Sequence, residues 1–458
     1  MENELNLKAV KTLSRRGVGM SQTQVISLGF LTIIIIGTLL LSLPVSNANG
    51  ESTAFLDCLF TATSATCVTG LVTVDTCMHW SVFGQCIILL MIQIGGLGFM
   101  TIATLLFMMI NKKLGLRERQ ILSESINTLQ IGGVLKLTKR IVSVTAVVEG
   151  LGAVLLALRF FPQYGLAKGL YMGVFHSISA FCNAGFDLMG FTGEFSSLTG
   201  YANDVYVNII IMMLIIIGGI GFLVWDDVMT HGFRFKRYRL HSKIVLLVTS
   251  ILIFIGAALL FFAEANATGL GKPVGTRLLE ALFGSVTART AGFNTIDVAK
   301  MSPSGRLTTT VLMFIGGSPG STAGGIKTTT FVTLLLFGFS YIRKNNSFGL
   351  FGRRLQKDAL NKATAVFITN LTLVITATFI ICTSDGLPLS DVVFETTSAV
   401  STVGMSTGIT RSFSALSKIT VIFLMYCGRV GSLSFAAALA ERKAPSTVMP
   451  PAEDIIIG

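Results

Sequence analysis

The stretch that decides the fold is "FTATSATCVTGL" at residues 60–71, because the chain contains three further copies of it. They read "FHSISAFCNAGF" (175–186), "FGSVTARTAGF" (283–293) and "FETTSAVSTVGM" (394–405). Three copies share Phe, three residues, Ser-Ala, four residues, Gly and an apolar residue, whereas the third copy has Thr287 for Ser and is one residue shorter. The closing glycines are 115, 107 and 112 residues apart. Repetition at this regular spacing predicts a chain of four tandem units.

A second string follows the first in every unit. It reads "IGGLGF" (94–99), "IGGIGF" (217–222), "IGGSPG" (315–320) and "CGRVGS" (427–432). Its first glycine lies 25, 33, 24 and 24 residues after the closing glycine of the same unit. Two independent strings that repeat in the same order support the division into four units.

Long apolar runs flank each copy of the first string. Hydrophobic residues make up 52% of the chain and charged residues only 13%. Such runs are long enough to cross a hydrocarbon core of about 30 Å, whereas the first string itself is too short. The runs before it are 25–43, 140–161, 244–263 and 362–383, and the runs after it are 81–110, 204–229, 307–342 and 417–440. The sequence therefore predicts an integral membrane protein embedded in the lipid bilayer.

Basic residues cluster at 111–119, 234–243 and 343–357, each between apolar runs, while the connection 44–53 has no Lys or Arg. Basic loops of membrane proteins face the cytoplasm, so we expect these clusters and both termini on the cytoplasmic side. The net charge of +12 is thereby explained without a nucleic-acid partner. With both flanks of each unit cytoplasmic, the short segment must enter and leave from the outer side as a re-entrant pore helix.

The expected fold is an all-α integral membrane protein with four tandem helix–pore-loop–helix units around a pseudo-four-fold pore, formed by eight spanning helices and four re-entrant pore helices. The predicted divisions are a cytoplasmic N-terminal segment (1–23), unit 1 (24–116), unit 2 (117–230), unit 3 with a broken inner helix (231–344), unit 4 (345–441) and a cytoplasmic C-terminal tail (442–458).

The tips of the four predicted loops carry no carboxylate, so a ring of charged side chains is not expected to select an ion. Extended loops that end in glycine can instead turn backbone carbonyl oxygens toward a common axis, as in a potassium filter. The alternative is that small residues at the tips serve helix packing. The tip residues are Val68, Thr69, Gly70, Asn183, Ala184, Gly185, Thr290, Ala291, Gly292, Thr402, Val403 and Gly404.

The strings "SATCVTGL", "ISAFCNAGF", "ARTAGFN", "STVGM" and "GGSPGSTAGGIK" make the chain resemble the membrane subunit of the Ktr/Trk/HKT superfamily of potassium transporters, closest to the KtrB type. The resemblance implies a four-subunit potassium channel fused into one polypeptide. It also implies that glycine in all four loops accompanies K⁺ selectivity, and that serine in the first loop accompanies Na⁺ passage. Gly70 therefore favours K⁺ as the transported ion, while Asn183 and the short third loop make the four-fold symmetry imperfect.

The run 313–330, "MFIGGSPGSTAGGIKTTT", contains five glycines and a proline within what should be a spanning helix. Glycine costs about 1 kcal/mol and proline about 3 kcal/mol in a helix interior, so we expect an unwound segment rather than a kinked helix that merely packs. The resemblance implies that this segment is an intramembrane gate. The gate residues are Gly316, Gly317, Ser318, Pro319, Gly320, Ser321, Thr322, Ala323, Gly324, Gly325 and Lys327, together with Arg429.

Arg429 is the charged residue in the apolar stretch "IFLMYCGRVGSLSFAAALA". The second string aligns it with Gly96, Gly219 and Gly317 of the other units. A charge that faced lipid would be expensive, so we expect the guanidinium to project into the pore below the filter, near 316–325, as a barrier to K⁺. The resemblance implies the same role; the alternative is an ion pair with a buried acid.

The chain contains no GxGxxG in a strand–helix context and no Walker motif, so we expect no nucleotide to bind to it. The resemblance implies a homodimer in the plasma membrane and a separate cytoplasmic ring of nucleotide-binding, RCK-type subunits, and it leaves Na⁺ activation open. On the outer side, five acids could attract cations or simply be solvated. They are Asp75, Asp187, Glu194, Asp204 and Asp297.

The leading hypothesis is potassium uptake by channel-like conduction. The alternative is a secondary transporter for a small solute, because glycine-broken helices also build solute sites at the bilayer midplane. Four units in one orientation, rather than an inverted pair, speak against it. An enzyme is not expected, because an enzyme needs ionisable groups at membrane depth and the four histidines are expected near run ends or in loops. They are His79, His176, His231 and His241.

Overall fold

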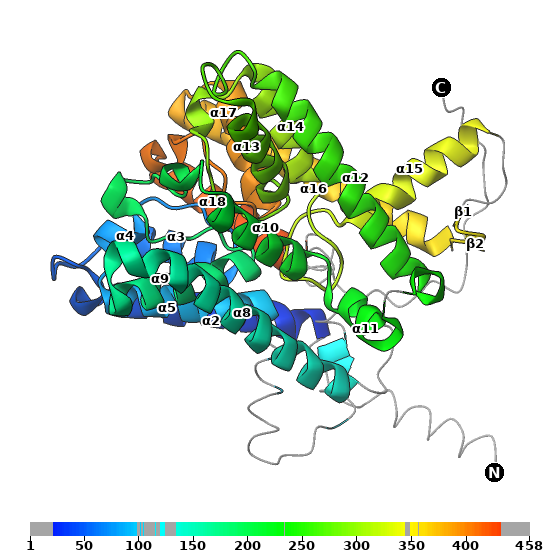
Figure 1. Ribbon diagram of the computed structural model, residues 1–458, viewed down its shortest axis with the longest axis horizontal. Coiled ribbons are helices and arrows are strands. Elements are labelled where there is room, and N and C mark those ends of the chain that lie inside the picture. Colours follow the sequence, from blue (N-terminus) through cyan, green and yellow to red (C-terminus); the bar gives the residue numbers. More distant parts are fainter. Residues whose placement is uncertain are drawn as a thin grey trace, which may run out of the picture.

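The computed structural model describes residues 22–98, 101, 104, 115, 120–123, 134–232, 234–343, 349–355 and 357–431 (Figure 1). This part of the chain is helical apart from one small antiparallel sheet of β1 (Gly349–Leu350) and β2 (Arg353–Arg354). Short connecting helices are α4 (Thr76–His79), η1 (Pro44–Ser46), η2 (Gly190–Thr192), η3 (Thr199–Tyr201), η4 (Phe235–Arg237), η5 (Val298–Lys300) and η6 (Ile409–Ser412). Most of the predicted N-terminal segment and the whole C-terminal tail lie outside the described residues, and the predicted unit boundaries remain predictions.

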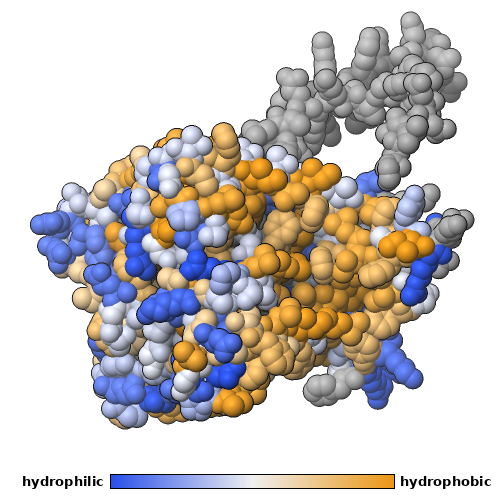
Figure 2. All heavy atoms as spheres, turned by 90° about the horizontal axis from the view of Figure 1, so that it is seen from above, coloured by the Kyte–Doolittle hydropathy of each residue, from blue (hydrophilic) through white to orange (hydrophobic). Residues whose placement is uncertain are grey.

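Four outer helices, one from each repeat, are the helices of the described part that are long and apolar enough to cross a membrane on their own. They are α2 (Gln22–Leu41), α8 (Val134–Tyr164), α12 (Leu240–Ala263) and α16 (Lys357–Asp385). Each exposes large apolar side chains, such as Ile36, Leu158, Phe254 and Phe379, which are 53%, 63%, 70% and 71% exposed. Figure 2 shows apolar side chains over much of the face in view. Apolar surface on this scale is suited to lipid rather than water, so the chain is an all-α membrane protein.

Four short helices carry the first repeated string. They are α3 (Phe55–Thr66), α9 (Leu166–Phe181), α13 (Val274–Thr287) and α17 (Leu389–Val400), with 12, 16, 14 and 12 residues. A spanning helix needs about 20 residues, so none of these crosses a membrane. Each ends inside its copy of the string, and the loop that follows contains the closing glycine.

The inner helices differ from the prediction. We expected one broken inner helix, in unit 3, but the inner run of every unit ends or bends at the second string. These runs form α5 (Val82–Leu97), α10 (Val205–Gly219) with α11 (Phe222–His231), α14 (Pro303–Phe314) with α15 (Thr328–Ile342), and α18 (Ala415–Val430). The axes of α10 and α11 differ by 96°. Within the described part the structure thus has four outer helices and four inner runs that end or bend at the second string, and the expected total of eight spanning helices stays a prediction.

The backbone conformation at one glycine position of the second string explains these helix ends. Gly98, Gly221 and Gly431 hold the last glycine position of the second string, and their φ angles are 84°, 98° and 95° with ψ near the extended range. Only glycine adopts this combination readily, because it has no β-carbon. In unit 3 the corresponding residue is Pro319, which cannot continue a helix either.

The units pack in a cycle. The inner helix of each unit contacts the short helix of the next unit, with α5 against α9, α10 against α13, α14 against α17, and α18 back against α3. Two ion pairs strengthen this arrangement. Arg306 of α14 bonds Asp391 of α17 (2.6 Å), and Lys418 of α18 bonds Asp57 of α3 (2.7 Å). The fourth unit therefore closes onto the first.

Candidate functional site

The loops after the four short helices meet at one centre. We call them the tip loops: residues 67–70, 182–185, 289–292 and 401–404. Their closing glycines leave no room for a side chain, because a β-carbon built on any of them would lie less than 3.0 Å from a carbonyl oxygen of the next loop. These contacts run from Gly70 to Ala184, from Gly185 to Ala291, from Gly292 to Val403 and from Gly404 to Thr69. Because the fourth loop contacts the first, the tip loops form a closed ring, and the structure brings all twelve predicted tip residues together.

The backbone conformation of the four tips is the same and is unusual. The first tip residue of each loop has positive φ: Val68 (58°), Asn183 (59°), Thr290 (77°) and Thr402 (51°). The closing glycines also have positive φ, between 70° and 90°. Positive φ costs a non-glycine residue roughly 1–2 kcal/mol, so four equivalent instances indicate a conformation held for function. Alternation of positive and negative φ turns successive carbonyl oxygens to one side of the chain.

The serine or threonine of the first string fixes each tip loop to its own short helix. In units 1 and 4 its hydroxyl accepts a hydrogen bond from the closing glycine, and in units 2 and 3 it donates to the residue after that glycine. The bonds are Gly70 N to Ser64 Oγ (3.0 Å), Gly404 N to Ser398 Oγ (3.1 Å), Ser179 Oγ to Phe186 O (2.6 Å) and Thr287 Oγ1 to Phe293 O (2.7 Å). The repeat contained these residues, but it did not reveal their role.

The first glycine of the second string is needed for close packing. In units 1, 2 and 4, a β-carbon on this glycine would lie less than 3.0 Å from the carbonyl oxygen of the last residue of the short helix. The pairs of glycine and carbonyl are Gly95 and Thr66, Gly218 and Phe181, and Gly428 and Val400. The inner helix can approach the tip loop only because this side chain is absent. Unit 3 departs from the pattern, because Gly316 approaches Gly324 of the interrupted segment instead.

Side chains also couple neighbouring tips. A hydrogen bond of 3.2 Å joins the Asn183 amide group to the Thr290 hydroxyl. The buried Oγ1 atoms of Thr69 and Thr402 have no hydrogen-bond partner within the described residues.

A cavity of about 890 Å³ opens on one side of the ring, and all four closing glycines line it. Its charged side chains are five carboxylates and three cations: Asp75, Asp187, Glu194, Glu280, Asp297, Lys272, Lys300 and Arg411. We call this cavity the vestibule. Four of the five acids considered in the sequence line it. Asp204 does not: it caps α10 and pairs with Arg159 at 2.7 Å, so its role is structural.

Residues 315–327, which we call the break segment, contact the ring residues that precede the closing glycines. Thr322 Oγ1 donates to the Phe181 carbonyl (3.1 Å), and a β-carbon on Gly324 would lie less than 3.0 Å from Thr402 Oγ1. Lys327 Nζ folds back onto the carbonyls of Ala323 (2.6 Å) and Gly324 (3.3 Å). The predicted gate residues from Gly316 to Lys327 therefore lie together beside the ring.

Arg429 lies in the last turn of α18 and reaches two other units. Its Nη1 donates to the Thr322 carbonyl of the break segment, and its Nη2 donates to the carbonyls of Gly95 and of Gly96, the latter at 3.0 Å. These partners are backbone carbonyls rather than the carboxylate of a buried ion pair. The guanidinium thus joins α18, the end of α5 and the break segment.

Sequence reasoning missed a buried carboxylate. Glu149 lies midway along α8 and is 8% exposed. Gln93 Nε2 donates to it (3.0 Å), and Cys182, the residue before the tip residue Asn183, lies 3.8 Å away through Sγ. A glutamate within the apolar run 140–161 was the available signal, because carboxylates at membrane depth are rare and functional.

The placement of His176 is also a correction. We expected the histidines near run ends or in loops, but His176 is fully buried within α9. Its Nδ1 lies 2.8 Å from the Met172 carbonyl, so Nδ1 carries the proton and Nε2 accepts from the Leu188 amide (3.3 Å). Its role is to hold the loop that follows the second tip.

Fold and site together define a multi-pass helical membrane protein whose four repeats surround one centre. A family model described as "TrkH: Cation transport protein" matches residues 18–447. The potassium/sodium uptake protein NtpJ of Enterococcus hirae is 40% identical over 96% of this chain and 98% of its own length. The Ktr system potassium uptake protein B of Bacillus subtilis is 41% identical over 95% and 97%.

The solved structures include a similar fold, the potassium transporter TrkH from Vibrio parahaemolyticus. Its TM-score is 0.71 at 16% identity, over 93% of this chain and 86% of that one. The chain therefore belongs to the TrkH family of cation transport proteins, and it is a membrane subunit of the KtrB type.

Proposed function

We propose that the chain takes up K⁺ through the ring of tip loops, which acts as a selectivity filter in a re-entrant pore. The observation that carries this proposal is the closed ring of four loops with the same alternation of backbone angles. Carbonyl oxygens on one side of each loop can replace the hydration shell of K⁺. The proposal also draws on the relatives, whose names describe potassium uptake.

The vestibule would collect cations in front of the filter. Its carboxylates outnumber its cationic side chains by five to three, and the closing glycines form its floor. A cleft lined by an excess of one charge raises the local concentration of counter-ions. We place this side outside the cell.

The break segment and Arg429 would form the gate on the opposite side. The segment contains the turn-forming glycines and touches the ring. The Arg429 guanidinium brings a fixed positive charge to it, while the Lys327 side chain folds back onto its carbonyls. Fixed positive charge in a narrow path opposes cation passage. Displacement of the segment would therefore open the path.

The working assembly would be a homodimer in the plasma membrane with both termini in the cytoplasm. The Bacillus relative is named as part of a Ktr system, which supports a separate regulatory partner. We propose that this partner is a ring of RCK-type nucleotide-binding subunits on the basic loops. The Enterococcus relative is named for both potassium and sodium, so Na⁺ as an activator belongs to the same proposal.

The direct test is flux of Rb⁺, a K⁺ analogue, into liposomes that contain this chain. We expect Rb⁺ flux that K⁺ inhibits, that organic solutes leave unchanged, and that the soluble partner and its nucleotide alter. Flux of an organic solute that Rb⁺ does not compete with would favour the secondary transporter. Absence of Rb⁺ flux with and without the partner would contradict the proposed function.

Asp187 gives the vestibule a predicted pH dependence. Burial raises its pKa to about 7, and the Asp75 carboxylate contributes in the same direction, while the Met189 amide opposes them. As the pH falls through 7, Asp187 binds a proton and the vestibule loses a negative charge. We therefore expect the Rb⁺ concentration for half-maximal flux to rise about two- to threefold between pH 8 and pH 6, the scale of a single nearby charge.

Asp187→Asn should remove this pH dependence. The Rb⁺ concentration for half-maximal flux should then be as high at pH 8 as it is at pH 6. Asp297→Asn is the matched control, because it removes an exposed carboxylate of the same vestibule and should leave the pH dependence in place. A full wild-type pH profile in Asp187→Asn would show that another group is responsible.

A further inference from the structure

In units 2 and 4, one side chain of the short helix braces the loop beyond the tip. It is the residue directly after the phenylalanine of the first string: His176 in unit 2 and Glu395 in unit 4. His176 Nε2 accepts from the Leu188 amide (3.3 Å), and Glu395 Oε1 accepts from the Thr407 amide (2.9 Å). Leu188 and Thr407 both lie three residues after the closing glycine, so both braces hold the same backbone group.

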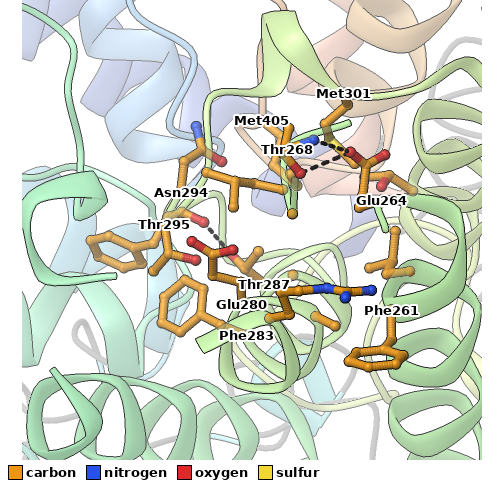
Figure 3. Close-up of a pocket in the computed structure, with 18 residues that line it drawn as sticks. Phe261, Glu264, Thr268, Glu280, Phe283, Thr287, Asn294, Thr295, Met301 and Met405 are labelled. Carbon is orange, nitrogen blue, oxygen red and sulfur yellow. Dashed lines mark hydrogen bonds between the residues drawn. The ribbon is translucent and has the colours of Figure 1, made fainter. Parts of the chain in front are cut away.

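Unit 3 has no side chain at this position, because the residue is Gly284. A β-carbon on Gly284 would touch only Leu260 Cδ1, at 3.3 Å, so space is available there. The space belongs to a cavity of about 20 Å³ lined by the phenyl rings of Phe283 and Phe293 and by the polar side chains of Glu280 and Thr295, among others (Figure 3). The cavity thus occupies the place of the missing brace.

Two polar atoms in the lining of this cavity have no hydrogen-bond partner in the part of the chain that the structure describes. Thr295, which corresponds to Leu188 and Thr407, is 4% exposed, and its Oγ1 has no hydrogen-bond partner within the described residues. The same is true of Asn294 Oδ1. The Glu280 carboxylate lies beside them in Figure 3 and is bonded to Lys272 (2.6 Å). Buried polar atoms of this kind are usually satisfied by a buried water.

Size and charge decide the occupant. A volume of roughly 10–15 Å³ is enough for one water molecule, and this cavity has about 20 Å³. Its two carboxylates, Glu264 and Glu280, are matched by Arg277 in the lining and by Lys272, so a further cation would be an unbalanced buried charge. A water molecule can donate to two acceptors without adding charge.

We propose that one ordered water in this cavity replaces the missing brace and positions the third tip loop, with Glu280 as the positioning residue that holds the water. The inference rests on the proposed filter function. It makes the third tip loop depend on a solvent-bridged contact where the second and fourth depend on direct ones.

The test compares Gly284→Ser with Gly284→Ala. The serine hydroxyl can take the position of the water, whereas the alanine methyl group fills space without a hydrogen bond. We expect Gly284→Ala to lower the ratio of Rb⁺ to Na⁺ flux about fivefold, which corresponds to about 1 kcal/mol. Gly284→Ser should keep this ratio within about twofold of the parent. Glu280→Gln keeps an acceptor for the water and should have an intermediate ratio.

Gly275→Ala and Gly275→Ser are matched controls on the same helix, where a β-carbon has no neighbour within 4 Å. Both should keep the parent ratio of Rb⁺ to Na⁺ flux.

Equal flux ratios for Gly284→Ala and Gly284→Ser, whether normal or lowered, would overturn the proposed water. A parent structure at a resolution that shows waters, but without density in the cavity, would overturn it too. Absence of Rb⁺ flux in the parent would contradict the proposed function instead.

Discussion

Replacing Gly70 by serine is expected to lower the ratio of Rb⁺ to Na⁺ flux by at least about tenfold, or about 1.4 kcal/mol. Two effects combine. Gly70 has a φ of 90°, which costs a serine roughly 1–2 kcal/mol. Its new β-carbon would also overlap the Ala184 carbonyl of the neighbouring loop. The carbonyl ring must then shift, and Na⁺ and K⁺ are no longer distinguished by its geometry. Relative flux in liposomes measures the effect.

Gly50→Ala is the matched control for backbone strain, because Gly50 also has positive φ (74°) but has open space around its β-position. It should leave the flux ratio unchanged. Gly185→Ser, Gly292→Ser and Gly404→Ser should resemble Gly70→Ser, with unequal magnitudes because the loops differ at Asn183 and Arg289. If all four serine variants keep the parent selectivity, the ring of carbonyls does not select the ion.

Arg429→Ala is expected to raise the maximal Rb⁺ flux about tenfold and to change the Rb⁺ to Na⁺ ratio by less than about twofold. A unit charge at ~8 Å in an effective dielectric of ~20 contributes about 2 kcal/mol to the barrier for a cation. The substitution also removes the hydrogen bond from the guanidinium to the Thr322 carbonyl, which restrains the break segment. Selectivity should persist because the tip loops keep their own contacts.

Arg429→Lys retains the charge and is the matched control. It should keep the low parent flux if charge forms the barrier, and it should behave like the alanine variant if only the hydrogen bonds matter. Surface expression must be measured in parallel. A loss of folded protein at the membrane in Arg429→Ala would identify the residue as a structural brace between α18, α5 and the break segment.

The repeats, the short helices and the meeting of the tip loops could be predicted, because each depends on a local pattern that recurs four times. The break in the inner helix of unit 3 could be predicted as well, but the helix ends at the second string in units 1, 2 and 4 could not. Glycine in an apolar run fits both close helix packing and positive φ, and the second string uses it for both purposes. Gly95 permits close packing, whereas Gly98, three residues later, ends the helix. One sequence contains no signal that separates these roles.

The partners of the polar residues also lay beyond the sequence. Arg429 was expected near the break segment, and its contact with Thr322 is consistent with that, but its bonds to Gly95 and Gly96 join residues more than 330 positions apart. Glu149 was visible as a charge in an apolar run, yet its contact with Cys182 depends on the packing of α8 against α9. Such pairings arise from tertiary structure and leave no local pattern.

The ion pair between Asp57 and Lys418 can form only late in synthesis of the chain. The two residues are 361 positions apart, and ribosomes add roughly 5–20 residues per second. The first short helix therefore waits on the order of tens of seconds in the membrane before its final neighbour is synthesised. During that time its tip backbone has a partner on one side only. A chain that stops before residue 401 lacks the fourth tip loop and therefore the closed ring, and one that stops before α18 lacks the bond from Lys418 to Asp57. Completion of the first unit thus depends on the last.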